Sequence, residues 1–429
     1  MKPAIRAKAE AQFALAQAKL ERLQSLDPLL LDVSLREPCF SSYYGHTLQN
    51  KVDLLRMVDE FGIRDKIIAT LDFQYPEYPE VEDEFCIYLN RIGYDLAGCF
   101  AETAVGTMSR GRFVPGPSML KLVEYNIPNT LHEIYLLDKD SANHPQVLER
   151  IANSVAWLRQ NVTGDHGGPC RIYVNVPDLP DAFYDIASRD WACQVLGLLA
   201  ELNVDGVSFE DARGTYFPFQ IGAIVRAMKA ILGPAQKVLF HSHTGNGMEN
   251  ASVLEALLEG ADGYWAGMDK ESSTIGHASM GELVANLMRA GNPAMAAKYK
   301  VERLLPICHA MHRINNETAP PQTWPIQGSN AYRQMYTGFD QTATRFMDLP
   351  PKAVGNAYTF RISPAGSDWR VIVGRVREAL GFKTDQPTAK SMILLMRQDL
   401  LNGIRIRYDD PDQLLKLYKR AQAPQAKAA

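Results

Sequence analysis

Residues 29–37 read LLLDVSLRE, an apolar run that ends abruptly in the pair Arg36 and Glu37. Much further along, the sequence VLFHSH ends a second apolar run in His241 and His243. Because side chains alternate along a strand, the two histidines point the same way. Two neutral imidazoles and one carboxylate are a common ligand set for a catalytic divalent metal, and an arginine beside such an ion can stabilise an oxyanion or enolate. A histidine pair of this spacing is also compatible with a purely structural role.

The composition is that of an ordinary globular protein, with 429 residues, 46% hydrophobic residues, 22% charged residues and a net charge of −4. This balance gives no footprint for nucleic-acid binding. No apolar run approaches the length of about 20 residues that spans a bilayer. We therefore expect neither a nucleic acid nor a membrane as a partner. The six cysteines are scattered without CxxC spacing, which is typical of reduced thiols and predicts a cytoplasmic protein.

Short apolar runs alternate with amphipathic stretches over the first two thirds of the chain. Eight of these runs read as strands, at residues 29–35, 66–71, 96–100, 131–137, 171–176, 206–210, 238–241 and 263–266. Strands that alternate with helices of about 10–15 residues indicate parallel βα units. Eight such units within about 270 residues fit a (β/α)8 barrel. A doubly wound open sheet is the alternative, although no GxGxxG follows the first strand, as its dinucleotide-binding version requires.

The sequence predicts four parts. An N-terminal helix at residues 1–26 precedes the barrel at 27–300. The regular alternation then stops, and a smaller, mostly helical C-terminal subdomain follows at 301–420, with a disordered tail at 421–429. A Pro-rich stretch, APPQTWP at residues 319–325, is typical of a linker.

Charged and imidazole side chains follow the predicted strands, where the catalytic loops of a barrel lie. These residues are Arg36, Glu37, Asp72, Glu102, Asp138, Asp211, His241 and His243. Polar residues at strand ends occur in any barrel. The convergence of an Arg–Glu pair with two histidines is more specific.

Several segments, in order along the chain, resemble a family of metal-dependent barrel lyases and synthases with a DxTLRE/D signature. That family includes isopropylmalate, homocitrate and citramalate synthases and 3-hydroxy-3-methylglutaryl-CoA (HMG-CoA) lyase. The segments are DVSLRE at 32–37, SFEDARGTYFP at 208–218, HSHTGNG at 241–247, TIGHASMGELV at 274–284, PIQGSNAYRQMYTG at 325–338 and PKAVG at 351–355. No single segment is decisive, but the ordered set is. The last two segments are typical of the synthases.

The resemblance implies a metal centre made of Glu37, His241 and His243, with Arg36 stabilising an enolate or alkoxide. The divalent ion (Zn, Mn, Mg, Fe or Co) chelates the carboxylate and carbonyl of a 2-oxo acid in this family. The enolate of a second substrate, typically an acyl-CoA, then adds to the carbonyl. The resemblance also implies a homodimer, because the synthases exchange their C-terminal segments between subunits.

The sequence departs from the family pattern on the substrate side of the centre. The family asparagine that reaches the metal in the lyase is His277 here, which is a candidate third imidazole ligand or a loop hydrogen bonder. Thr244 and Gly245 replace an Asn-Asp pair, and we expect Thr244 to face the substrate. Ala212 replaces a threonine that holds the substrate carboxylate, and the adjacent Arg213 is a candidate replacement.

The acid–base groups of the family are also replaced. Asp72 is a candidate stand-in for a family glutamate on the second strand, and Asp340 occupies the place of a C-terminal histidine. An aspartate is a poor base unless its pKa is raised. His46 and His144, each in a loop after a predicted strand, are candidate general bases, although either can be a loop residue with no role.

We predict a metal-dependent enzyme that forms a carbon–carbon bond by adding an enolate to a 2-oxo acid. Cleavage of a 2-hydroxy or 2-oxo acid by the same platform, as a lyase or aldolase, is the first alternative. A non-catalytic protein on a degenerate barrel is the second. The retained Arg36, Glu37, His241 and His243 argue against the last.

Overall fold

The described parts of the computed structural model are residues 3–71, 80–137, 143–335 and 349–423. The chain divides into two compact units, residues 1–319 and 320–429. The division falls further along the chain than the barrel boundary that we predicted near residue 300. Helix α13 (Leu304–Asn316) explains the difference, because it packs against α3 (Leu48–Phe61) in unit 1.

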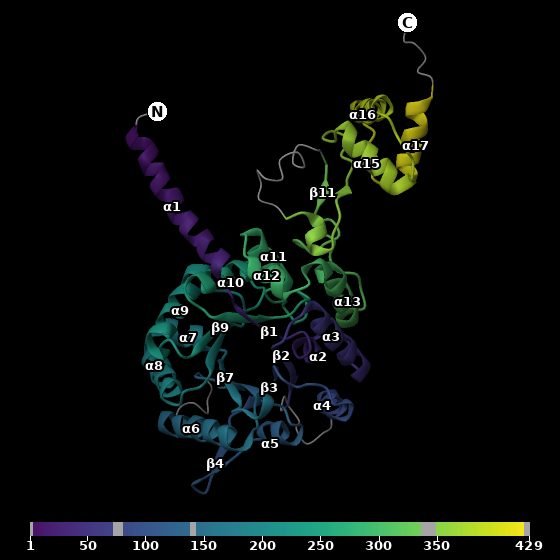
Figure 1. Cartoon of the computed structure of the whole chain (residues 1–429). Coiled ribbons are helices and arrows are strands. Elements are labelled where there is room, and N and C mark those ends of the chain that lie inside the picture. Colours follow the sequence, from purple (N-terminus) through teal and green to yellow (C-terminus); the bar gives the residue numbers. More distant parts are fainter. Residues whose placement is uncertain (1–2, 72–79, 138–142, 336–348, 424–429) are drawn as a thin grey trace. The chain divides into compact units, whose positions relative to one another are not determined.

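Eight parallel strands close into a barrel in unit 1 (Figure 1). In chain order the strands are β1 (Leu29–Asp32), β2 (Lys66–Thr70), β3 (Cys99–Ala104), β6 (Asn129–Glu133), β7 (Arg171–Val176), β8 (Gly206–Asp211), β9 (Lys237–Ser242) and β10 (Gly263–Ala266). Around the barrel the order is β1-β10-β9-β8-β7-β6-β3-β2, and β2 pairs with β1 to close it. The predicted (β/α)8 barrel is therefore confirmed, and the open sheet is excluded.

Helices connect the strands and lie outside them (Figure 1). Besides α3 and α13 they are α2 (Glu37–Ser41), α4 (Val81–Ile92), α5 (Pro117–Glu124), α6 (His144–Asn161), α7 (Leu179–Tyr184), α8 (Ile186–Glu201), α9 (Pro218–Leu232), α10 (Glu249–Leu258), α11 (Met280–Arg289) and α12 (Pro293–Lys298). Local sequence sets their ends. Thr47 and Asn50 form a capping box at the start of α3, and Gly62 ends that helix in the left-handed conformation.

Alternating residues of the strands fill the barrel interior. The inner cluster consists of Leu31, Val33, Ile67, Phe100, Leu131, Tyr173, Leu239 and Trp265. Because side chains alternate, residues two positions beyond these along the same strands face the mouth of the barrel at the carboxyl ends. This register decides which polar side chains meet there.

Two features of unit 1 were not predicted from the sequence. A hairpin of β4 (Thr107–Ser109) and β5 (Arg112–Val114) follows β3, and α5 comes after it. Arg110 and Gly111 both have positive φ at the tip of the hairpin, as a tight two-residue turn requires. The strands are too short and too exposed to give an alternating apolar pattern.

Helix α1 (Pro3–Ser25) belongs to unit 1. Its Lys19 pairs with Glu255 of α10 at 3.3 Å, and the Asn292 amide donates to the carbonyls of Leu23 and Leu26. Only the end of the helix is anchored in this way, since the exposed fractions of Phe13 and Leu15 are 75% and 66%.

Unit 2 has a hydrophobic core of its own. Its elements are β11 (Arg333–Gln334), β12 (Thr359–Phe360), α15 (Trp369–Leu380), α16 (Gln386–Leu401) and α17 (Pro411–Gln422). Ile372, Met392 and Leu417 are buried together where the three helices pack. Among the described residues of the chain, no helix has the length and apolar composition needed to cross a membrane.

Candidate metal centre

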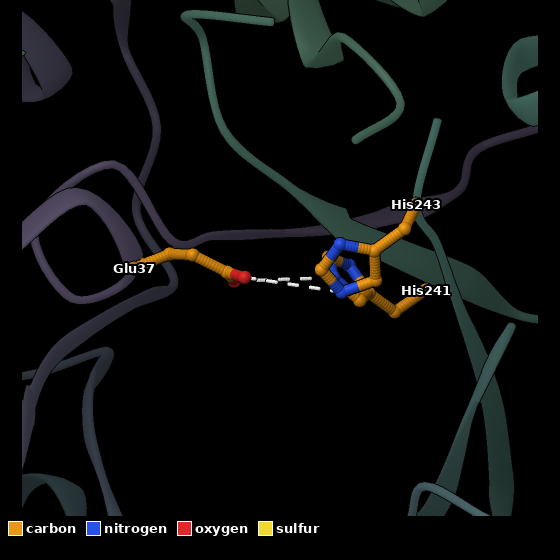
Figure 2. A group of neighbouring side chains, drawn as sticks. All are labelled: Glu37, His241 and His243. Carbon is orange, nitrogen blue, oxygen red and sulfur yellow. Dashed lines mark hydrogen bonds and ion pairs between the residues drawn. The ribbon is translucent and has the colours of Figure 1, made fainter. Parts of the chain in front are cut away.

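Glu37, His241 and His243 meet at the mouth of the barrel (Figure 2). The two histidines come from the end of β9, and Glu37 is the first residue of α2, just after β1. The Nε2 atoms of His241 and His243 are 3.1 Å apart. The Glu37 carboxylate faces them, with Oε2 3.9 Å from His241 Nε2 and Oε1 3.8 Å from His243 Nε2. Among the described residues, this is the one group of three such side chains compact enough to hold a metal ion.

The hydrogen bonds behind the histidines fix their tautomers. His241 Nδ1 lies 2.8 Å from the carbonyl oxygen of Trp265, and the two rings are stacked with centroids 3.7 Å apart. His243 Nδ1 lies 3.2 Å from the carbonyl oxygen of Gly276 and 3.0 Å from Ser273 Oγ. A carbonyl oxygen can only accept, so each Nδ1 carries the proton and each Nε2 of a neutral ring presents a lone pair.

Burial keeps both rings neutral. It lowers the pKa of His241 well below its ordinary value, and the neighbouring His243 and His277 lower it further. Burial also lowers the pKa of His243, against the opposing effect of Glu37. Two lone pairs and a carboxylate therefore converge with no proton between them. This donor set fits a divalent cation, whose protein ligands are typically oriented by such outer hydrogen bonds.

Close contact between two loops holds His243 in place. Gly214, in the turn after β8, has a φ of +61°, and a Cβ built on it would lie 2.2 Å from the carbonyl oxygen of His243. Gly245 faces it, and a Cβ there would lie 2.0 Å from the carbonyl oxygen of Arg213. Only glycine fits either position. Gly245 thus explains the departure from the family Asn-Asp pair, because the loop after β9 is pressed against the turn after β8.

Arg36 joins the centre to a second set of carboxylates. Its Nη1 lies 3.2 Å from Glu37 Oε2, its Nη2 lies 2.5 Å from Glu102 Oε2, and its Nε donates to Thr70 Oγ1 at 2.9 Å. Burial disfavours the guanidinium charge, but Glu102 and Glu37 oppose it and hold the pKa of Arg36 above its ordinary value. The side chain is therefore a fixed positive charge beside the centre.

Three glutamates and an asparagine follow one another around the mouth, on the four consecutive strands that begin beside the histidine strand β9, and we call them the acidic ring. They are Glu102 of β3, Glu133 of β6, Asn175 of β7 and Glu210 of β8. The Asn175 amide donates to Glu210 Oε1 at 2.6 Å and to Glu133 Oε2 at 3.3 Å. Burial and the other carboxylates raise the pKa of Glu102 well above its ordinary value, and that of Glu210 to about 8.

Of the acidic ring, only Glu102 was predicted to lie at the catalytic end of the barrel, and without a specific role, although the sequence contains a signal for other members too. Glu102, Glu133 and Asn175 each stand two residues after an inward apolar residue, namely Phe100, Leu131 and Tyr173. Alternation along the strands would have placed them inside the mouth.

His277 lies beside the centre but uses its ring nitrogens elsewhere. Its Nε2 contacts Ser272 Oγ, and its Nδ1 lies 2.8 Å from the carbonyl oxygen of Ala278. Its ring centroid is 5.7 Å from that of His241 and 6.5 Å from that of His243. The structure thus brings together three of the four predicted ligands. His277 would have to turn its ring to become a fourth.

The two predicted general bases lie in different surroundings. His46 is buried, and its Nε2 lies 2.9 Å from Asn315 Oδ1, while the Asn315 amide donates to Asp269. Burial lowers the pKa of His46 to about 4. His144 is the exposed first residue of α6 and stacks on Trp191, with ring centroids 3.9 Å apart.

The predicted substrate-side residues are partly accounted for. Arg213 is exposed, and Thr244 is partly buried, with its backbone amide donating to the carbonyl of Gly276. Asp211 caps the turn after β8 by accepting from the amides of Thr215 and Tyr216. The predicted Asp72, Asp138 and Asp340 lie outside the described residues.

Comparison with known proteins agrees with this fold. No family model matches the chain. The chain is 23% identical over 305 residues to a probable 2-isopropylmalate synthase of Methanopyrus kandleri, a match that covers 71% of this chain and 55% of that protein. The chain spans about half the length of the synthases that it matches.

Two solved structures have a similar fold. The HMG-CoA lyase of Brucella melitensis superposes with a TM-score of 0.54 at 15% identity, over 68% of this chain and all of the lyase. The carboxyl transferase domain of Rhizobium etli pyruvate carboxylase, solved with pyruvate, gives a TM-score of 0.50 at 12% identity, over 91% of this chain and 64% of that one. The predicted resemblance to the barrel lyases and synthases is thus confirmed as weak sequence similarity and a shared fold.

Proposed function

We propose that the chain is a metal-dependent enzyme that makes a carbon–carbon bond by adding an enolate, supplied by an acyl-CoA, to the carbonyl of a 2-oxo acid. One observation carries the proposal. The Nε2 lone pairs of two neutral histidines, 3.1 Å apart, face the Glu37 carboxylate beside the fixed guanidinium of Arg36.

Glu37, His241 and His243 would hold the ion, which, when bound, supplies a Lewis acid that polarises the 2-oxo acid. Zn, Mn, Mg, Fe and Co are the candidate ions, since imidazole and carboxylate ligands suit them. Arg36 would stabilise the negative oxygen that develops during addition. The Arg36 side chain would not have to move during the addition, because Glu102 and Thr70 already fix its position.

The remaining groups have supporting roles in the proposal. Trp265, Ser273 and Gly276 keep the histidine rings in the ligating tautomer. Arg213 and Thr244 would contact the substrate. His46 and His144 stay the predicted general bases, although the low pKa of His46, about 4, makes it neutral but a weak base near pH 7.

Thiol release from acetyl-CoA and other acyl-CoAs, measured against a panel of 2-oxo acids with Mn²⁺, Mg²⁺ or Zn²⁺, tests the reaction. We expect release that requires both a 2-oxo acid and Glu37, so that Glu37→Gln is inactive. A matched control is Glu201→Gln, which changes an exposed carboxylate at the end of α8.

Cleavage is the second candidate, because the barrel has the fold of HMG-CoA lyases and the same centre serves both directions. A lyase or aldolase would be established by two results together. The metal-loaded protein would release no thiol in the assay, and it would cleave 2-hydroxy or 2-oxo acids in a reaction that Glu37→Gln abolishes. A protein that keeps its biological role in the Glu37→Gln variant would be the non-catalytic barrel.

We further propose that the chain is a homodimer, as the synthase resemblance implies, and that it is cytoplasmic, as its scattered cysteines predict. Sedimentation at micromolar concentration tests the dimer, and a monomer there would contradict it.

A further inference from the structure

The charges at the barrel mouth do not balance. Four carboxylates, those of Glu37 and of the acidic ring, act on the single guanidinium of Arg36. The two histidines of the centre are held neutral by burial. With all four carboxyls ionised, even a bound divalent ion leaves the mouth net negative. A 2-oxo acid, itself an anion, would add to this excess.

The acidic ring also contains an acceptor without a donor. The Asn175 side chain is fully buried, its amide nitrogen donates to Glu133 and Glu210, and its Oδ1 has no hydrogen-bond partner. Turning the amide over would point its oxygen at two carboxylates, so the observed orientation is the favourable one. A buried unpaired acceptor costs free energy, which a ligand that donates hydrogen bonds would recover.

The chemistry of the ring selects the kind of ligand. Its one donor, the Asn175 amide nitrogen, is already used by Glu133 and Glu210, and its ionised carboxylates and the amide oxygen are acceptors, so the ligand must be a cation or a multiple donor. Among the described residues, the three glutamates of the ring do not form a group as compact as Glu37, His241 and His243, as three carboxylate ligands of a second metal ion would. An ammonium group on a carbon chain, with three donors, suits a wider set of acceptors. Glu133 and Glu210 are partly exposed, so a ligand can reach them from the mouth.

We infer that the acidic ring binds an ammonium group, and that the substrate of the proposed reaction is an acid that also carries a protonated amine. The carboxylate end of such a substrate lies at the metal centre and Arg36, and its ammonium end lies between Glu133 and Glu210, where it donates to Asn175 Oδ1. This inference rests on the proposed function for the position of the carboxylate end. Burial and the neighbouring carboxylates raise the pKa values of Glu102 and Glu210, and an ammonium group beside them would favour their ionised forms.

Calorimetry on the Mn²⁺-loaded full chain tests the inference with matched ligands. The probes are ω-amino acids of increasing length, such as 4-aminobutanoate, each compared with the acid in which a methyl group replaces the ammonium, such as pentanoate. We expect at least one ω-amino acid to bind about tenfold or more tightly than its methyl counterpart, because charge-assisted hydrogen bonds contribute that much. Glu133→Gln and Glu210→Gln should each remove most of this preference. Glu201→Gln, the exposed control, should keep it.

Two further measurements separate this inference from the proposed function. Butylammonium has no carboxylate, so its binding to the metal-free chain, compared with butan-1-ol by NMR, tests the acidic ring alone. Ammonium preference in a protein that binds no metal would support the ring and sink the proposed function. Two outcomes would overturn the inference and leave the proposed function intact, given metal binding and Glu37-dependent catalysis. One is the absence of any preference for the ammonium ligand at every chain length. The other is a preference that both Glu133→Gln and Glu210→Gln leave unchanged. Two bound metal ions per chain would also overturn it.

Discussion

The metal centre and the acidic ring share one barrel mouth but differ in how the sequence encodes them. Glu37, His241 and His243 lie in contiguous motifs, whereas the ring draws one residue from each of four strands. The centre is a compact group with neutral imidazoles and hydrogen bonds that orient every ring. The ring instead keeps charged or crowded carboxyls and an unpaired amide oxygen. The geometry of the metal centre suits a single divalent metal ion, whereas the acidic ring suits a larger cation that supplies the missing hydrogen-bond donors.

The largest effect should come from breaking the centre. Glu37→Gln removes the one anionic ligand, and we expect the affinity for Mn²⁺ or Zn²⁺ to fall by at least about a hundredfold, since changes of outer partners alone cost 10- to 100-fold. Calorimetric titration of the metal-free chain measures it. Unchanged affinity would mean that the ion, if any, lies elsewhere. The Glu201→Gln control should bind metal like the unaltered chain.

A substitution that displaces His243 without replacing any of the three metal ligands should lower the free energy of unfolding. Gly214→Ala forces a Cβ toward the carbonyl oxygen of His243 at a φ of +61°. We expect a loss of about 1–3 kcal/mol in the free energy of unfolding, with weaker metal binding because the loop after β9 must shift. Gly233→Ala is the matched control. It also has positive φ, but a Cβ there meets nothing within 4 Å, so it should carry the backbone strain without displacing His243. Equal metal affinities in the two variants would contradict this account of the loop.

The acidic ring should show the opposite behaviour, since it destabilises the metal-free fold. Burial and neighbouring carboxylates raise the pKa of Glu210 from 4.5 to about 8. A carboxyl with a raised folded pKa contributes stability below its unfolded pKa and loses it as the pH rises through the folded value. Between about pH 4.5 and 8, ionisation of Glu210 therefore favours the unfolded chain.

Glu210→Gln should remove that penalty and stabilise the metal-free chain by about 1–2 kcal/mol at pH 8, since the glutamine oxygen can still accept from the Asn175 amide, although in a weaker, uncharged hydrogen bond. The gain should shrink toward pH 5, where the carboxyl is protonated in the fold. Denaturant unfolding at both pH values measures it. A variant that is less stable than the unaltered chain at pH 8 would show that the ring is not under charge repulsion.

Features that depend on neighbouring residues in the sequence were predicted well, and features that depend on contacts between distant segments were not. All eight barrel strands were expected, because apolar runs between helices are local features, and β7 and β10 match at both ends. Glu37, His241 and His243 were expected together because the motif order brought a known arrangement with it. The hairpin of β4 and β5 was missed because its strands bury too little to show a pattern.

Glu133, Asn175 and Glu210 of the acidic ring were missed for a different reason. Glu102, Glu133 and Glu210 are each an unremarkable acid at a strand end, and only the closure of the barrel brings them near one another. The hydrogen-bond partners of His277 could not be predicted from the sequence either. The contact of its Nε2 with Ser272 depends on the path of a loop that no periodicity describes.

The smallest effect should come from the hydrogen bonds behind the centre. Ser273→Ala removes the hydroxyl 3.0 Å from His243 Nδ1 but leaves the carbonyl of Gly276 at 3.2 Å. Because one acceptor still holds the tautomer, we expect metal affinity to fall by about tenfold at most. Calorimetry measures that change, and the melting temperature of the metal-free variant should be nearly unaltered. A loss as large as that in Glu37→Gln would mean that Ser273 itself contacts the ion. Ser273 would then be a fourth ligand, which neither the sequence motifs nor the arrangement of Glu37, His241 and His243 predicts.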